Sequence, residues 1–255
     1  MLNQLEPNSH RFPQIVKIST STILQCLKNG FQDTLISGFP SLFYGACFAL
    51  AGSGIYLLLS DAMALFVGLT TGFFLLGPAL AMGLYHLSQQ ISSGVKPKLL
   101  PSLFAWRSNV ANLGLFAGML TILLLIWARA SLVIFAIFFE GGLPTTQMVL
   151  ASVMTMQQPV FTLIYFTVGG IFATFVFCTS VIAVPLISQQ NTDAITAGIA
   201  SIKVCLSNPA AMFFWALCIV TLTALSFFTG FIGLIITMPI LGHSTWHVYR
   251  AVIKA

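Results

Sequence analysis

This chain of 255 residues is 58% apolar, and only 6% of its residues carry charge. Soluble domains carry about 25% charged residues, so a soluble fold could not keep its surface hydrated with so few. The mean hydropathy of +0.98 indicates that lipid surrounds most of the surface. The net charge of +5 is spread along the chain without a basic cluster, which argues against nucleic-acid binding.

Six mostly apolar stretches are long enough to cross the hydrocarbon core, which takes about 20 helical residues. They are Ser41–Ser60, Ala62–Leu87, a stretch that starts near Asn109, Pro159–Ile187, Ala210–Thr229 and Phe231–Tyr249. We expect turns around Asp61 and at Gly230. The pattern predicts an all-α membrane protein: a cytoplasmic segment over residues 1–40, then a bundle of six transmembrane helices over residues 41–255.

The positions of the cations predict how this bundle is oriented. Nine of the ten Lys and Arg residues fall on one predicted side: Arg11, Lys17, Lys28, Lys96, Lys98, Arg107, Lys203, Arg250 and Lys254. Positive residues favour the cytoplasmic side, so we expect both ends of the chain there. The outer side holds Arg129 with the acids Asp61 and Glu140, and we interpret these three as paired or hydrated charges near the interface.

The third stretch is longer than one membrane crossing. From Asn109 to Phe139 it has 31 residues, interrupted only by Arg129. A helix of that length would measure about 46 Å, against a hydrocarbon core of about 30 Å. Either the helix projects beyond the outer surface, or it ends near Trp127 and the chain folds back.

Two cytoplasmic segments have the spacing of amphipathic helices. Their apolar faces are formed by Leu24, Leu27, Phe31 and Leu35, and by Ile195, Ile199, Ile202 and Leu206. Thr192 or Asp193 can cap the second helix. We expect both helices to lie along the membrane surface and to cover the base of the bundle.

The even-numbered stretches share a pattern that suggests three pseudo-repeated helical hairpins. Each carries a late proline (Pro78, Pro185 and Pro239), and a polar residue follows each proline eight positions later (His86, Asp193 and His247). Three such hairpins would bring these polar ends together at the cytoplasmic base. Internal repeats of membrane proteins often place a binding site at their interface.

Two interpretations of these polar residues stay open. His86, Asp193 and His247 have the composition of a two-histidine, one-carboxylate metal site, and His243 shares a helix face with His247. The competing hypothesis is a hydrogen-bonded cluster that closes the base of the bundle. Its further members are Tyr85, Trp246, Tyr249 and Arg250. We expect no resident cofactor, with a metal or haem as the alternative.

The segment from Met238 to Arg250 reads Pro-x-x-Gly-His-x-Thr-Trp-His-x-Tyr-Arg from its second residue. It resembles the closing signature of a family of uncharacterised bacterial integral membrane proteins with a domain of unknown function. Shorter similar pieces begin at Ser41, Gly77 and Thr192. The resemblance implies a bacterial inner-membrane protein without an assigned activity, and it suggests other inner-membrane proteins, such as respiratory complexes, as partners.

Catalytic signatures are missing from the sequence, including paired carboxylates, a Walker A loop and GxSxG. We therefore expect a protein that is not an enzyme and that binds or assembles with a partner in the membrane. One alternative is a small-molecule transporter or channel that uses the kinked helices. The other is a metal- or haem-binding membrane protein.

Overall fold

The structure, a computed structural model, describes residues 12–59, 80–139 and 152–254. Most of the chain within these ranges is helical and no strand occurs there, although one isolated β-bridge joins Ile15 to Ile253. The helices are α1 (Thr20–Ser37), α2 (Phe39–Leu59), a helix over residues 80–92, α4 (Leu99–Leu103), η1 (Ala105–Asn109), α5 (Val110–Phe138), α7 (Pro159–Ser180), α8 (Ala183–Gln190), α9 (Ala194–Ser207), α10 (Pro209–Phe228) and α11 (Leu234–Val252). The predicted all-α fold is confirmed for this part of the chain.

Local chemistry explains where the helices begin and end. Ser19 accepts a hydrogen bond from the Thr22 N–H and begins α1. Gly38 ends α1 at a φ of 58°, a conformation that favours glycine, and the chain bends by 106° into α2. The predicted cap of α9 is confirmed at Asp193, which accepts the Thr196 N–H at 2.9 Å. This hydrogen bond holds the pKa of the Asp193 carboxyl below its ordinary value.

Three segments are long and apolar enough to cross a membrane: Leu99–Phe138, Pro159–Gln190 and Pro209–Phe228. The bent pair of α1 and α2 makes a fourth if it counts as one span. The predicted bundle of six spans is therefore not confirmed. Most of predicted span two lies outside the described residues. The sixth predicted span corresponds to α11. This helix is not among the segments apolar enough to cross a membrane, because its second half is polar.

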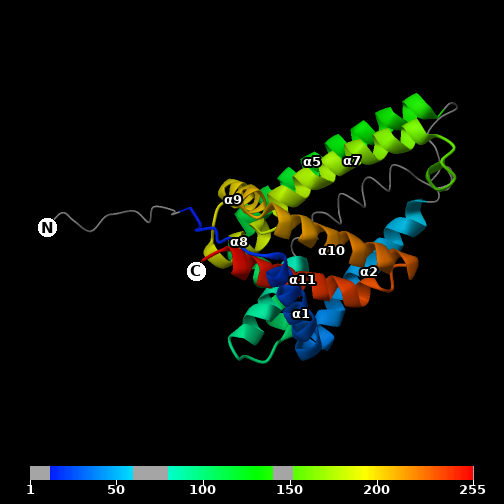
Figure 1. The fold of residues 1–255 in the computed structure, drawn as a ribbon. Coiled ribbons are helices and arrows are strands. Elements are labelled where there is room, and N and C mark those ends of the chain that lie inside the picture. Colours follow the sequence, from blue (N-terminus) through cyan, green and yellow to red (C-terminus); the bar gives the residue numbers. More distant parts are fainter. Residues whose placement is uncertain (1–11, 60–79, 140–151, 255) are drawn as a thin grey trace.

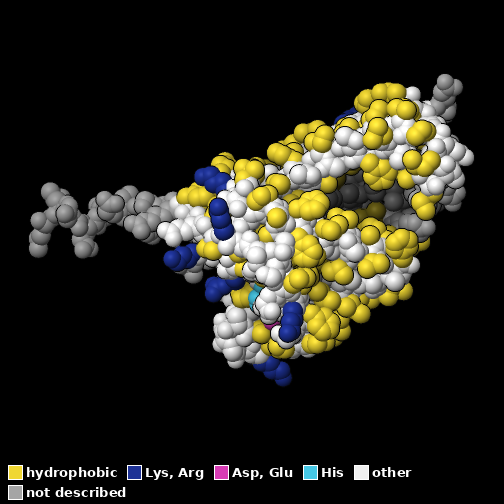
Figure 2. All heavy atoms as spheres, in the orientation of Figure 1, with side chains coloured by type: hydrophobic (Ala, Val, Ile, Leu, Met, Phe, Trp, Pro, Cys, Tyr) yellow, Lys and Arg dark blue, Asp and Glu magenta, His cyan; other side chains and the backbone are white. Residues whose placement is uncertain are grey.

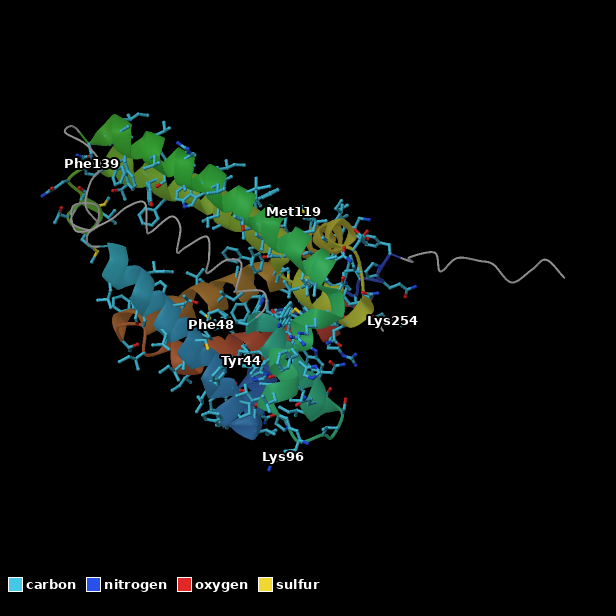
Figure 3. All side chains as sticks on the ribbon, turned by 180° about the vertical axis from the view of Figure 1, so that it is seen from behind. Tyr44, Phe48, Lys96, Met119, Phe139 and Lys254 are labelled. Atoms are coloured by element: carbon cyan, nitrogen blue, oxygen red, sulfur yellow. The ribbon has the colours of Figure 1, made fainter. Side chains whose placement is uncertain are left out.

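The long third stretch forms one continuous helix. α5 runs from Val110 to Phe138 over 29 residues and does not fold back at Trp127. Of the two predicted paths, the fold-back near Trp127 is therefore not observed, and projection of the helix beyond the outer surface stays a prediction. Figure 3 shows Phe139, directly after α5, at the opposite end of the molecule from Lys254.

The helices form two groups that meet at one end (Figure 1). α5 and α7 lie side by side as a long antiparallel pair. In the second group α11 packs between α1 and α2, and α10 packs beside α11. α8, α9 and the C-terminal end of α11 lie at the common end, which we call the base. Figure 2 shows most of the visible Lys and Arg side chains around this base and near α1, whereas hydrophobic side chains cover much of the rest of this face.

The threefold repeat is not confirmed. α10 and α11 form one hairpin, with Gly230 at its turn as expected, at a φ of 63°. Asp61, predicted at the first turn, lies outside the described residues. The late prolines also differ in their settings, since Pro239 lies inside α11 while Pro185 lies in α8, after a break from α7. At that break the Ser201 hydroxyl accepts the Ile182 N–H at 3.4 Å.

Both predicted amphipathic helices exist, but their larger apolar side chains face outwards. On α1, Leu24, Phe31 and Leu35 are exposed, while the buried positions include Ile23, Cys26 and Gly30. On α9, Ile195, Ile199 and Leu206 are exposed, while alanines are buried. Small residues permit close helix contact, and exposed large aliphatic residues suit a lipid environment. The observed faces therefore agree with helices at a membrane surface.

Candidate functional site

Five polar side chains from four helices meet where α1, α2, α11 and the helix over residues 80–92 pack together. We call this group the polar network. Its members are Asp33 on α1, Ser41 on α2, Ser88 on the helix over residues 80–92, and His243 and His247 on α11.

The members form one continuous chain of hydrogen bonds. Asp33 Oδ2 lies 2.9 Å from His247 Nε2 and accepts the Ser88 hydroxyl at 2.7 Å. Ser88 Oγ lies 2.6 Å from His243 Nδ1. At the far side of the ring, His243 Nε2 lies 2.7 Å from Ser41 Oγ. These short distances leave no space between neighbours for an intervening water.

The network is almost entirely buried. Ser41, Ser88 and His243 have no exposed surface, and 6% of Asp33 is exposed. His247 is the member that reaches the surface, with 19% of its side chain exposed. A buried carboxylate is costly unless other groups donate hydrogen bonds to it, and here Ser88 and His247 do so.

Close packing of the backbones brings these side chains together. A Cβ atom at Gly30 of α1 would collide with Ser244 of α11. A Cβ atom at Gly45 of α2 would collide with the backbone of Ile235 of α11. Only glycine permits such approach, so α1 and α2 lie directly against α11 and their short polar side chains reach its histidines.

The predicted cluster at the base contacts this network through Trp246. Tyr85 is hydrogen-bonded to Thr245 and Tyr249 to Gln190. The Trp246 ring meets the His247 ring edge-on, with 5.0 Å between the ring centroids. The guanidinium of Arg250 lies over Trp246, 5.8 Å from its ring centroid. These side chains therefore pack at the base as a structural cluster would require.

The predicted metal ligands are divided between different surroundings. His243 and His247 belong to the polar network, whereas half-buried His86 is hydrogen-bonded to Gln89 and Asp193 caps α9. Among the described residues, no group of three or more His, Cys, Asp or Glu side chains could hold a metal ion. The structure thus gives the metal hypothesis no assembled ligand set within those residues.

Of the three predicted outer charges, only Arg129 can be located. It is exposed on α5. Asp61 and Glu140 lie outside the described residues, so their predicted pairing with Arg129 stays a prediction.

The sequence prediction missed Asp33, Ser41 and Ser88. Asp33 is one of five acidic residues in the chain, and it lies three positions after Gly30 on the face of α1 opposite the large apolar side chains. An acid on the small-residue face of a membrane helix is a signal for a buried partner. That signal could have identified Asp33, whereas the two serines carry none.

The order of groups in the network is that of a nucleophile, a base and an orienting acid. Ser41 faces the imidazole of His243, whose other nitrogen reaches Asp33 through Ser88. In hydrolases this order activates the serine. Ser41 and His243 have no exposed surface, however, so a substrate could not reach them in this conformation.

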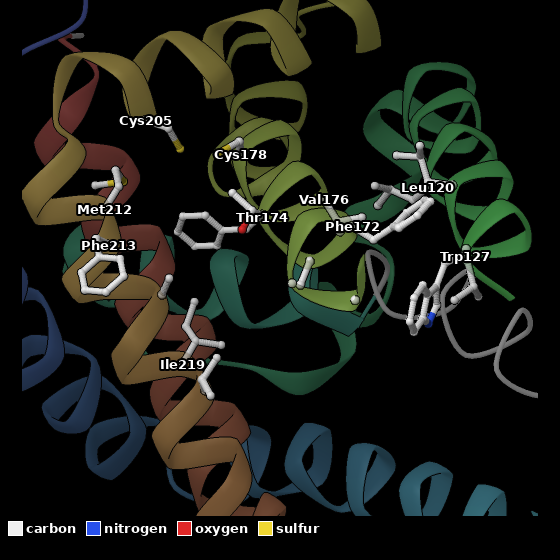
Figure 4. A pocket seen from close by; sticks show the side chains of 18 of the residues that line it. Leu120, Trp127, Phe172, Thr174, Val176, Cys178, Cys205, Met212, Phe213 and Ile219 are labelled. Carbon is white, nitrogen blue, oxygen red and sulfur yellow. The ribbon is translucent and has the colours of Figure 1, made fainter. Parts of the chain in front are cut away.

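A second candidate site is a cavity of about 840 Å³ between α5, α7, α9 and α10. Figure 4 shows Trp127, Leu120 and Phe172 at one side of it, with Met212, Phe213 and Ile219 of α10 at the other. Its walls are apolar apart from a few groups: the Thr174 hydroxyl, the Trp127 indole nitrogen and the thiols of Cys178 and Cys205. Such a lining suits a hydrophobic molecule.

The comparisons with known proteins agree with a membrane location. Residues 65–189 match the model of a family described as "Predicted integral membrane protein (DUF2189)". This match confirms the resemblance to integral membrane proteins of unknown function, although the motif from Met238 to Arg250 lies outside the matched residues. The comparisons with curated proteins and with solved structures found no match.

Proposed function

Because this chain is an integral membrane protein whose residues 65–189 match a family of unknown function, we propose that it binds a hydrophobic molecule of the bilayer. The binding site is the cavity between α5, α7, α9 and α10, and the binding is not enzymatic. The observation that carries this proposal is the size and lining of the cavity.

The cavity has the dimensions of a ligand site. Sites for small molecules usually measure about 300–1,000 Å³ and combine apolar walls with a few polar groups. The cavity of about 840 Å³ falls within that range. Water would find few hydrogen-bond partners there, so hydrocarbon is the better occupant. A lipid acyl chain is the most abundant hydrocarbon in a bilayer, and we assign the site to it.

With this assignment, the partner expected of a partner-binding or assembly protein is a lipid. A protein partner, including a respiratory complex, would instead occupy the cavity with an apolar helix. A transporter would need a continuous polar path, for which this apolar lining gives no support. A haem would need an axial ligand, and among the described residues the wall offers two cysteines and the methionine of α10.

Native mass spectrometry of the gently extracted protein tests the proposal. A Cβ atom at Gly170 meets no other atom within 4 Å, so Gly170→Leu can fill part of the cavity without a backbone collision. We expect the wild type to retain a lipid-sized mass. Gly170→Leu should bind the lipid at least about tenfold more weakly, which corresponds to about 1.4 kcal/mol of binding free energy.

Gly118→Leu is the matched control. Gly118 on α5 also has open space around it but does not line the cavity. This variant should retain the lipid as the wild type does. Equal retention by both variants, or a stoichiometric protein in place of the lipid, would contradict the proposal.

The proposal includes a location: the protein lies in a bacterial inner membrane, with both chain ends on the cytoplasmic side. The cations at the base support this orientation, since positive residues favour the cytoplasm. A reporter enzyme that is active only in the cytoplasm, fused after Ala255, should be active. Activity of a periplasmic reporter at that position, with the cytoplasmic reporter silent, would reverse the orientation.

A further inference from the structure

We propose that Cys178 and Cys205 bind one Cu(I) ion in the wall of the cavity. This site goes beyond the lipid assigned to the cavity and does not depend on it, because two sulfur atoms hold the ion. The proposal rests on two observations. The thiols come from different helices and face each other, and the side chains around them are soft or apolar.

The contact between α7 and α9 brings the two thiols together. Cys178 lies in the last turn of α7, and Cys205 lies near the end of α9. The two backbones run close to each other, since a Cβ atom at Gly198 of α9 would lie 3.9 Å from the carbonyl oxygen of Thr179. Figure 4 shows the sulfur ends of Cys178 and Cys205 pointing towards one another at the cavity wall.

Both cysteines are reduced, and their surroundings do not suit a nucleophile. Burial, and to a smaller extent the neighbouring thiol of Cys178, raise the pKa of Cys205 to about 12. A thiol that stays protonated reacts poorly, so this pair does not fit covalent catalysis. The neighbouring thiol nevertheless shows that the two sulfur atoms are close enough to share one ligand.

The types of ligand in the wall select Cu(I) among the common metal ions. The described residues of the lining add the thioether of Met212 and the hydroxyl of Thr174, but no Asp, Glu or His. Mg²⁺ and Ca²⁺ need several oxygen ligands, and Zn²⁺ usually needs four ligands. Thiolate and thioether sulfur favour Cu(I). Two thiolates are enough for this ion, so the site does not need a group of three His, Cys, Asp or Glu, which the described residues do not form.

Binding exchanges protons for the metal ion without oxidation or reduction. The S–H bonds of Cys178 and Cys205 break, each sulfur forms a bond to Cu(I), and both protons leave to water. The product holds one Cu(I) between two thiolates and carries one negative charge. Because protons are released, the ion should bind more tightly as the pH rises.

Anaerobic titration of the full-length protein in lipid nanodiscs with Cu(I), in competition with a coloured Cu(I) chelator, tests the proposal. We expect the wild type to take one Cu(I) per chain from the chelator. Cys178→Ser and Cys205→Ser should each bind at least about 100-fold more weakly, because loss of even an outer partner of a metal ligand costs about 10–100-fold. A wild type that leaves all the Cu(I) with the chelator would overturn the proposal.

Two control variants make the test specific. Cys218 lies on α10 and does not line the cavity, so Cys218→Ser should bind Cu(I) as the wild type does. If it loses as much affinity as Cys178→Ser and Cys205→Ser, the assignment of the ligands is wrong. Gly170→Leu should lose the lipid but keep Cu(I), so failure of this proposal and failure of the proposed function are seen separately. The wild type and Cys218→Ser decide the question even if a variant of the pair fails to fold.

Discussion

Replacement of Gly45 by alanine is expected to destabilise the protein by about 3 kcal/mol, the upper part of the usual range for an overpacked contact. The added Cβ would collide with the carbonyl group of Ile235, which belongs to the backbone of α11 and cannot rotate away. α2 and α11 would have to separate, and Ser41 would then move away from His243. Thermal unfolding in a mild detergent, followed by circular dichroism, measures the effect.

Gly54→Ala is the matched control on the same helix. A Cβ atom at Gly54 meets nothing within 4 Å. Alanine is favoured over glycine in a helix by about 1 kcal/mol, so this variant should be as stable as the wild type or slightly more stable. If Gly45→Ala and Gly54→Ala unfold at the same temperature, the close contact between α2 and α11 is not a source of stability.

The sequence predicted the helices well because their signals are local. The spacing of Leu24, Phe31 and Leu35 predicted α1, and Asp193 identified the start of α9. The faces of the helices were harder to assign. In a soluble protein the large apolar residues would be buried, but in lipid they can be exposed while glycine and alanine form the contacts. The sequence alone does not show whether a given helix face meets lipid or water.

The candidate site was predicted in part for a similar reason. His243 and His247 lie four residues apart on one helix, so their shared face follows from the sequence. Their partner Asp33 lies more than 200 positions away, and the packing of α1 on α11 brings it there. Asp193 was chosen because it follows Pro185 by eight positions, yet its carboxylate satisfies the N-terminus of its own helix. Spacing along the chain cannot separate a local role from a long-range one.

The second large effect is expected at Asp33. Asp33→Ala should destabilise the protein by about 3 kcal/mol, the upper part of the usual cost of leaving buried hydrogen-bond donors without their acceptor. Without the carboxylate, the Ser88 hydroxyl and His247 Nε2–H both lose their acceptor in a buried place. Urea unfolding at neutral pH, followed by tryptophan fluorescence, measures the loss.

Two comparisons separate this effect from a general loss of charge. Asp193→Ala also removes a carboxylate, but it deletes only a helix cap and should cost about 1 kcal/mol. In a double-mutant cycle, Asp33→Ala and His247→Ala should be non-additive by at least about 0.5 kcal/mol, because each removes the same contact. Additive effects would mean that the 2.9 Å contact between Asp33 and His247 contributes nothing. The cost of removing Asp33 would then come from its hydrogen bond with Ser88.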